Sequence, residues 1–159
     1  MPITTSKEKF PPMEYEKLKV FLGLYTDWFF PKVGAKPENH PLIFLANLEK
    51  KSLANARRGL QMAVNDIVEM SSEWSPEQVA AADAKFASHG TFTLTEVRHR
   101  YSRKYLQVLK RGHIKSEQEY YLLKGIADGG CIEPGATERE QIESMLGQYE
   151  KLIVDRNPG

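Results

Sequence analysis

The sequence predicts an all-α protein, a single-domain bundle of about six helices, and two observations carry that prediction. Apolar residues recur at helical spacing along most of the 159 residues, and residues that favour helix starts and ends separate these segments. The one stretch with strand-like alternation, residues 91–94, is too short to build a sheet. We expect helices at about residues 12–30, 41–71, 76–88, 94–111, 117–128 and 138–154.

The composition is close to that of ordinary soluble proteins, with 41% hydrophobic and 27% charged residues. The longest strongly apolar run, residues 20–24, is far shorter than the roughly 20 residues that cross a bilayer. The first residues lack the apolar run of a signal peptide, and a lone cysteine fits a reducing compartment. We therefore expect a cytoplasmic protein with no membrane contact. Its single domain would span residues 11–155, with flexible tails at residues 1–10 and 156–159.

The first expected helix is started by two prolines, Pro11 and Pro12, and is unusually aromatic. Because it is apolar on nearly all sides, the favoured interpretation is a central core helix. The alternative is a surface that meets a partner or a second subunit. The candidate interface residues are Tyr25, Trp28, Phe29 and Phe30.

The second expected helix, residues 41–71, is long for a globular protein, so we expect a kink or break near Ser52 or Gly59. Glu49 falls inside its apolar stripe, where a carboxylate needs a partner or water. Arg98 is misplaced in the same way in the helix at 94–111. We hypothesise that Glu49 and Arg98 form a buried ion pair across a helix interface.

Capping signals mark the remaining helices. In each, a serine or threonine precedes a glutamate or glutamine by three positions, the spacing of a capping box. The four pairs are Ser75 with Gln78, Thr93 with Glu96, Ser116 with Glu119, and Thr137 with Glu140. Gly90 and Gly112 follow two of the helices, where glycine is favoured.

Charge is distributed unevenly although the net charge is only +1. Residues 1–93 are neutral, residues 94–116 carry +6, and residues 117–159 carry −5. A cluster of cations on one helix attracts phosphate groups or an acidic protein. The alternative is a solvated helix face that the acidic C-terminal helices balance. The candidate residues for such a partner are Arg100, Arg103, Lys104, Gln107, Arg111, His113 and Lys115.

Signatures of catalysis and of metal binding are missing from the sequence. The four histidines are not spaced as metal ligands, and no glycine-rich phosphate loop follows a strand. Cys131 has no neighbouring base that would activate it as a nucleophile. We therefore expect no metal, no cofactor and no catalytic residue. An enzyme site assembled from distant residues stays open, with Glu49, Asp66, Arg98 and Tyr101 as the first places to look.

Two functions fit this sequence. The first is a small non-enzymatic helical protein that acts by protein–protein interaction or self-association, as an adaptor, inhibitor or neutraliser does. The alternative is a nucleic-acid-binding protein that contacts the phosphate backbone with residues 94–115. A helix-turn-helix is disfavoured, because its second helix would open with Glu117 and Glu119 against the phosphates.

Overall fold

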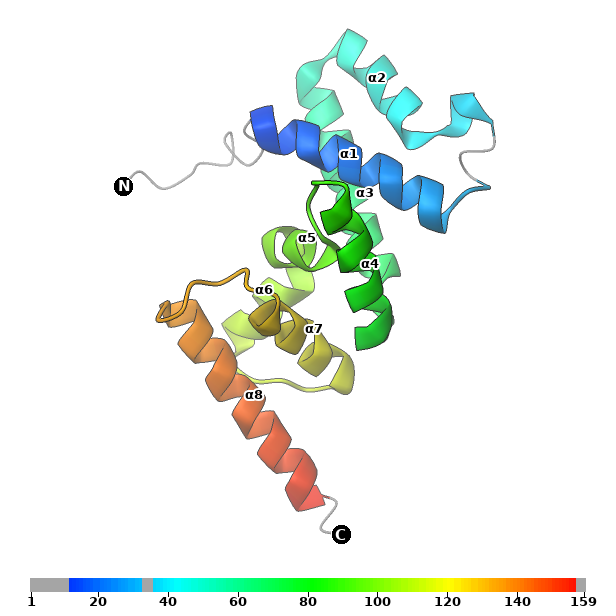
Figure 1. The fold of residues 1–159 in the computed structure, drawn as a ribbon. Coiled ribbons are helices and arrows are strands. Elements are labelled where there is room, and N and C mark those ends of the chain that lie inside the picture. The colour runs from blue at the N-terminus through cyan, green and yellow to red at the C-terminus, as the bar shows by residue number, and fades with distance from the viewer. Residues whose placement is uncertain (1–11, 33–35, 157–159) are drawn as a thin grey trace. The chain divides into compact units, whose positions relative to one another are not determined.

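The computed structural model describes residues 12–32 and 36–156, and this part of the chain is helical and contains no strand (Figure 1). The all-α prediction is confirmed. The helices are α1 (Pro12–Phe29), the short 3₁₀ helix η2 (Pro37–Asn39), α2 (Pro41–Lys51), α3 (Leu53–Met70), α4 (Pro76–Ser88), α5 (Leu94–Tyr101), α6 (Arg103–Arg111), α7 (Glu117–Asp128) and α8 (Thr137–Arg156). The tail predicted at residues 1–10, and residues 157–159 of the other tail, lie outside the described residues.

Two of the predicted helices are each divided at a serine, which raises the number of α-helices in the described residues from about six to eight. Ser52 separates α2 from α3, where a break was expected, and Ser102 separates α5 from α6, where it was not. Both serines are extended, with ψ of 119° and 116°. Each hydroxyl accepts the N–H three residues on, at 3.2 Å for Ser52 and 3.1 Å for Ser102. A side chain thereby satisfies a donor that a helix start leaves without a partner.

The chain divides into two compact units. In the described residues, unit 1 contains residues 12–32, 36–67 and 84–93, and unit 2 contains residues 68–83 and 94–156. Helices α3 and α4 each contribute residues to both units. The sequence-based expectation of a single domain over residues 11–155 stays a prediction, which the division into two compact units does not test.

Unit 1 is built on stacked aromatic rings. Phe21 and Phe86 are fully buried, and their ring centroids lie 4.6 Å apart. Two glycines let α2 approach its neighbours closely. A Cβ atom on Gly23 of α1 would lie 2.7 Å from the Leu42 side chain. A Cβ on Gly59 of α3 would lie 3.0 Å from the side chain of Leu48 in the same way. Leucines of α2 therefore occupy the space left by missing side chains on α1 and α3.

Unit 2 has a separate apolar core in which α6, α7 and α8 meet. Its buried side chains are those of Tyr105, Val108, Ile114, Leu123, Ile126, Ala127, Ile132, Ile142, Met145 and Leu146. The loop after α7 lies against the first turn of α5, because a Cβ on Gly129 would be 2.8 Å from the Thr95 side chain. This core supports α6, the helix with the cluster of cations.

Candidate functional site

A buried carboxylate lies beside the basic helix α6. The Glu119 side chain is only 4% exposed and accepts hydrogen bonds from Lys104, Arg111 and the Lys115 backbone N–H. The Lys104 Nζ atom lies 3.2 Å away and the Lys115 nitrogen 2.9 Å away. Burial favours a higher pKa for Glu119, but these hydrogen bonds outweigh it and leave the pKa below its ordinary value. Glu119 is therefore a charged anchor for two of the cations.

The hydrogen bonds of Glu119 divide the cations of α6 into two groups. Lys104 and Arg111 are held by Glu119, whereas Arg103 and Lys110 have no ion pair within the described residues. Arg103, Gln107 and Lys110 are exposed and follow one another at i, i+4 and i+7, which places them in one stripe. Leu106 lies at the edge of this stripe and is 60% exposed. We call Arg103, Lys104, Leu106, Gln107, Lys110 and Arg111 the basic face of α6.

The remaining predicted members lie around this face. Arg100 is exposed on α5, beyond the break at Ser102. His113 is exposed in the loop after α6, and its carbonyl accepts a hydrogen bond from Arg111 Nε at 3.1 Å. Lys115 is exposed as well and uses its backbone to bind Glu119. These cations extend the positive charge of α6 at both of its ends.

Glu49 and Arg98 each have partners of their own, in different units. The Glu49 carboxylate accepts hydrogen bonds from Tyr15 at 2.6 Å and from Lys19 at 3.0 Å. Arg98 is buried and donates to the backbone carbonyl and the hydroxyl of Ser71. These contacts give each charged side chain hydrogen-bonding partners within its own unit. The ion pair between Glu49 and Arg98 stays a prediction.

The aromatic candidates of α1 differ in how far they reach the surface. Tyr25 is 1% exposed and belongs to the core of unit 1. Trp28 is half-buried, with its ring 5.0 Å from that of Phe86 and the Lys85 Nζ atom 4.4 Å from its centroid. Phe29 is half-buried too, and Phe30 is 36% exposed. Most of the surface of these four aromatic side chains is therefore buried inside unit 1.

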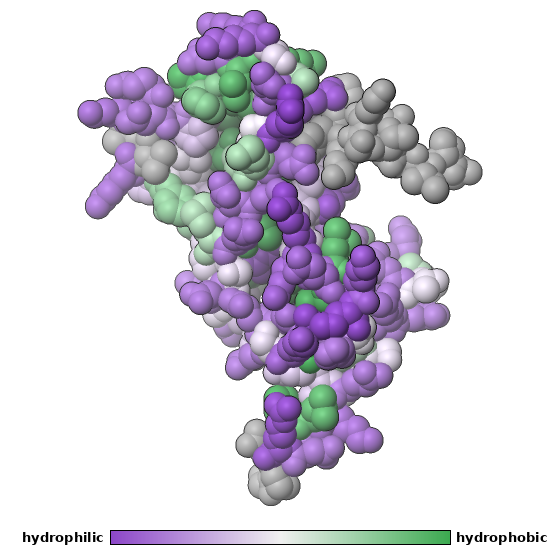
Figure 2. Space-filling view, turned by 180° about the vertical axis from the view of Figure 1, so that it is seen from behind, coloured by the Kyte–Doolittle hydropathy of each residue, from purple (hydrophilic) through white to green (hydrophobic). Residues whose placement is uncertain are grey.

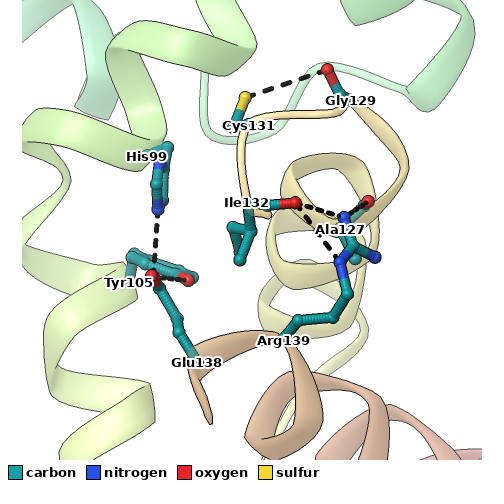
Figure 3. Close-up of polar contacts among 8 residues, drawn as sticks. All are labelled: His99, Tyr105, Ala127, Gly129, Cys131, Ile132, Glu138 and Arg139. Atoms are coloured by element: carbon teal, nitrogen blue, oxygen red, sulfur yellow. Dashed lines mark hydrogen bonds and ion pairs between the residues drawn. The ribbon is translucent and has the colours of Figure 1, made fainter. Parts of the chain in front are cut away.

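A polar cluster in unit 2 has no counterpart in the sequence predictions (Figure 3). Glu138, in the first turn of α8, accepts the Tyr105 hydroxyl at 2.5 Å and lies 2.9 Å from His99 Nε2. Burial alone would raise the pKa of Glu138, but the hydrogen bonds from Tyr105 and His99 lower it. His99 and Tyr105 lie on opposite sides of the Ser102 break, so Glu138 ties α5 and α6 together. Residues 39 positions apart leave no periodic signal in a sequence.

Arg139 holds the loop between α7 and α8, and Figure 3 shows its guanidinium between two carbonyls. It donates to the carbonyl of Ala127 at 3.1 Å and to that of Ile132 at 2.9 Å. The same loop carries Cys131, whose Sγ lies 3.9 Å from the Gly129 carbonyl. Burial, with Glu96 and Asp83 nearby, raises the pKa of the Cys131 thiol. The thiol is therefore kept protonated near neutral pH, the opposite of what a nucleophilic cysteine needs.

Across residues 12–32 and 36–156 no group of three potential metal-ligating side chains is close enough to hold an ion. None of the helices in these residues is long and apolar enough to cross a bilayer. Comparisons with protein-family models, curated proteins and solved structures found no match.

Proposed function

We propose that this chain acts by binding another protein through the basic face of α6, as a non-enzymatic adaptor, inhibitor or neutraliser does. The observation that carries the proposal is the exposed Leu106 beside the stripe of Arg103, Gln107 and Lys110. An exposed leucine gains free energy when a partner covers it, and the cations favour an acidic partner. Glu119 supports this surface by holding Lys104 and Arg111 in place.

A protein partner fits this face better than a nucleic acid does. The four cations of the face are partly neutralised by Glu119, which leaves a smaller positive charge for phosphate groups. Leu106 adds nothing to a phosphate contact, whereas apolar side chains together with arginine are common in protein interfaces. The total charge of +1 also differs from the clearly basic character of most nucleic-acid-binding domains.

Nucleic acid binding is the second candidate, and the spacing of Arg103, Gln107 and Lys110 favours it. Three exposed hydrogen-bond donors in one stripe along a helix suit a run of backbone phosphates. Binding of this kind would weaken steeply as salt is added, because phosphate contacts release counterions. Retardation of duplex DNA and of RNA at low salt measures it directly.

The experiment compares the full chain with two variants that lose the same number of charges. The first carries Leu106→Ser, Arg103→Gln and Lys110→Gln on α6. The matched control carries Phe44→Ser, Lys50→Gln and Lys51→Gln on α2, where Phe44 is 64% exposed. Tagged proteins are expressed in the cells of origin, and lysates with and without nuclease treatment are analysed for retained proteins.

We expect the wild type and the α2 variant to retain the same partner, and the α6 variant to lose it. If the α6 variant retains the partner as well as the wild type does, the proposal is wrong. If binding disappears on nuclease treatment while duplex DNA is retarded, the second candidate replaces the first.

A further inference from the structure

Helix α2 is fully engaged on its inner side. Leu42 packs at Gly23 of α1, Leu45 is 3% exposed, and Leu48 packs at Gly59 of α3. The Glu49 carboxylate is held by Tyr15 and Lys19 of α1. Side chains three and four positions apart share a helix face, so these residues define the side of α2 that unit 1 already covers.

The outer side of α2 combines apolar and cationic residues. Ile43, Phe44, Asn47, Lys50 and Lys51 are all exposed, and their spacing of i, i+1, i+4, i+7 and i+8 places them on one face. We call these five residues the outer face of α2. Phe44 is the most exposed aromatic side chain in the described residues, at 64%, and Ile43 is 45% exposed. Figure 2 shows hydrophobic side chains at the surface of the part of unit 1 that contains α2.

Positive charge continues beyond this helix. Lys50, Lys51, Arg57 and Arg58 follow one another with no acidic residue before Asp66, so residues 50–65 carry +4. The nearest carboxylate, Glu49, is bound to Lys19 instead. Within the part of the chain that the structure describes, Arg58 donates only to the neutral side-chain oxygen of Asn55, at 2.8 Å. Residues 50–65 themselves contain no acidic residue, and Leu53 among them is 53% exposed.

We propose that the outer face of α2 docks on an anionic lipid surface. This proposal departs from the sequence-based expectation of no membrane contact, which rested on the lack of a spanning segment. Phe44 and Ile43 would enter the boundary between headgroups and acyl chains, while Lys50, Lys51 and Arg58 lie among the anionic headgroups. At about 1.5 Å per residue α2 is a short helix, so it lies on the surface and does not span it. This proposal is independent of the protein-binding role of α6.

Two features favour lipid over the other anionic partners. The cations of the outer face are lysines, whereas the basic face of α6 includes Arg103 and Arg111. Arginine is enriched and lysine depleted in protein–protein interfaces, and flexible, hydrated lysines suit a diffuse layer of headgroups. Exposed Phe44 and Ile43 gain from an apolar medium, which the phosphate backbone of a nucleic acid does not provide.

The test is co-sedimentation of the full chain with vesicles, either of phosphatidylcholine alone or of phosphatidylcholine mixed with phosphatidylglycerol. We expect binding to the mixed vesicles only, weak and reversible, and weaker at high salt. Each of Lys50→Gln and Lys51→Gln should weaken it about fivefold, which corresponds to about 1 kcal/mol per basic residue near an anionic surface. Phe44→Ser should reduce it at least as much. In Phe44→Trp, the tryptophan fluorescence should shift to the blue on mixed vesicles more than in the wild type.

The matched controls lie on α6. Leu106→Ser removes an apolar side chain of similar exposure, 60% against 64%, and Arg103→Gln with Lys110→Gln removes the same charge as the lysine pair on α2. These variants should bind the mixed vesicles like the wild type. Because all substituted side chains are exposed, circular dichroism should show an unchanged fold.

Four outcomes overturn the proposal. Equal losses in the α2 and α6 variants would mean unspecific attraction to charge. Unchanged binding in Phe44→Ser would remove α2 from the contact. Equal binding to neutral vesicles would mean that anionic headgroups are not what the face recognises. Absence of vesicle binding, with duplex DNA or a captured protein lost from the α2 variants alone, would assign the face to that partner instead.

Discussion

The two units use different interactions at their centres. Unit 1 packs aromatic rings against one another, as Phe21 and Phe86 show, and the Glu49 carboxylate joins α2 to α1. Unit 2 relies more on carboxylates that join helices, with Glu119 binding α6 from α7 and Glu138 binding α5 and α6 from α8. The stability of a core of packed rings falls when side-chain volume is removed. The stability of a network of charged groups falls when a partner is removed, and it depends on pH. The two units should therefore fail under different substitutions.

The two units can also be compared at the serines that separate consecutive helices, Ser52 in unit 1 and Ser102 in unit 2. Ser52 and Ser102 make the same cap on the helix that follows, with nearly equal distances. Ser102 is 2% exposed, whereas Ser52 is half-buried and its cap lies at the surface. Water can replace the exposed hydrogen bond of Ser52 more easily than the buried one of Ser102. We therefore expect the Ser102 cap to contribute more to the free energy of unfolding.

The largest effect is expected in the core of unit 1. Phe86→Ala removes a fully buried ring that contacts Phe21 and Trp28, and should cost about 3–5 kcal/mol of stability. Hydrogen exchange should show the loss first in α1. The exposed Phe30→Ala is the control and should change little. Equal effects of the two substitutions would contradict the aromatic core.

The next effect tests the charged anchor in unit 2. Glu119→Ala removes the acceptor for Lys104, Arg111 and the Lys115 N–H, and should cost roughly 1–3 kcal/mol, because the two cations can still reach water. Urea denaturation measures this cost, with the exposed Glu117→Ala as the control, expected within about 0.5 kcal/mol of wild type. A loss no larger than that of the control would mean that the network contributes nothing.

The caps come next. Ser102→Ala should cost about 2 kcal/mol, the upper end for a helix cap, because the Tyr105 N–H is left buried. Ser52→Ala should cost about 0.5–1 kcal/mol, because the Asn55 N–H can bind water. Thermal unfolding of both variants gives the ranking, and a reversed order would show that burial does not set the value of the cap.

The smallest effect is expected from pH, and it has opposite signs for two carboxyls of unit 2. The lowered pKa of Glu138 contributes stability above its ordinary value of 4.5, and this contribution is lost as pH falls through the folded pKa. Burial raises the pKa of Asp83 against its hydrogen bonds from Thr95, so its contribution is full below 3.8 and is lost as pH rises through the folded pKa. Stability of Glu138→Gln should fall less steeply in acid than that of wild type, and stability of Asp83→Asn more steeply. Parallel curves for all three proteins would refute the assignment.

The sequence alone determined the helical class and most of the helix ends. Ser75 and Gln78 form the predicted reciprocal cap at 2.8 and 3.1 Å, and Gly112 ends α6 with φ of 87°. These features depend on residues within one turn of each other, where spacing carries the information. The cluster of cations on α6 could be predicted as well, because its residues are close together in the sequence.

Only the tertiary structure decided which of those charges are available. Glu119 lies eight residues from Arg111 and takes it into a buried pair, whereas Arg103 keeps an exposed position. Glu138 reaches Tyr105 across 33 residues, and Phe44 is left on the uncovered side of α2. Contacts between separate helices depend on which faces meet, and that choice is made by the packing of the whole core and leaves no local pattern in the chain.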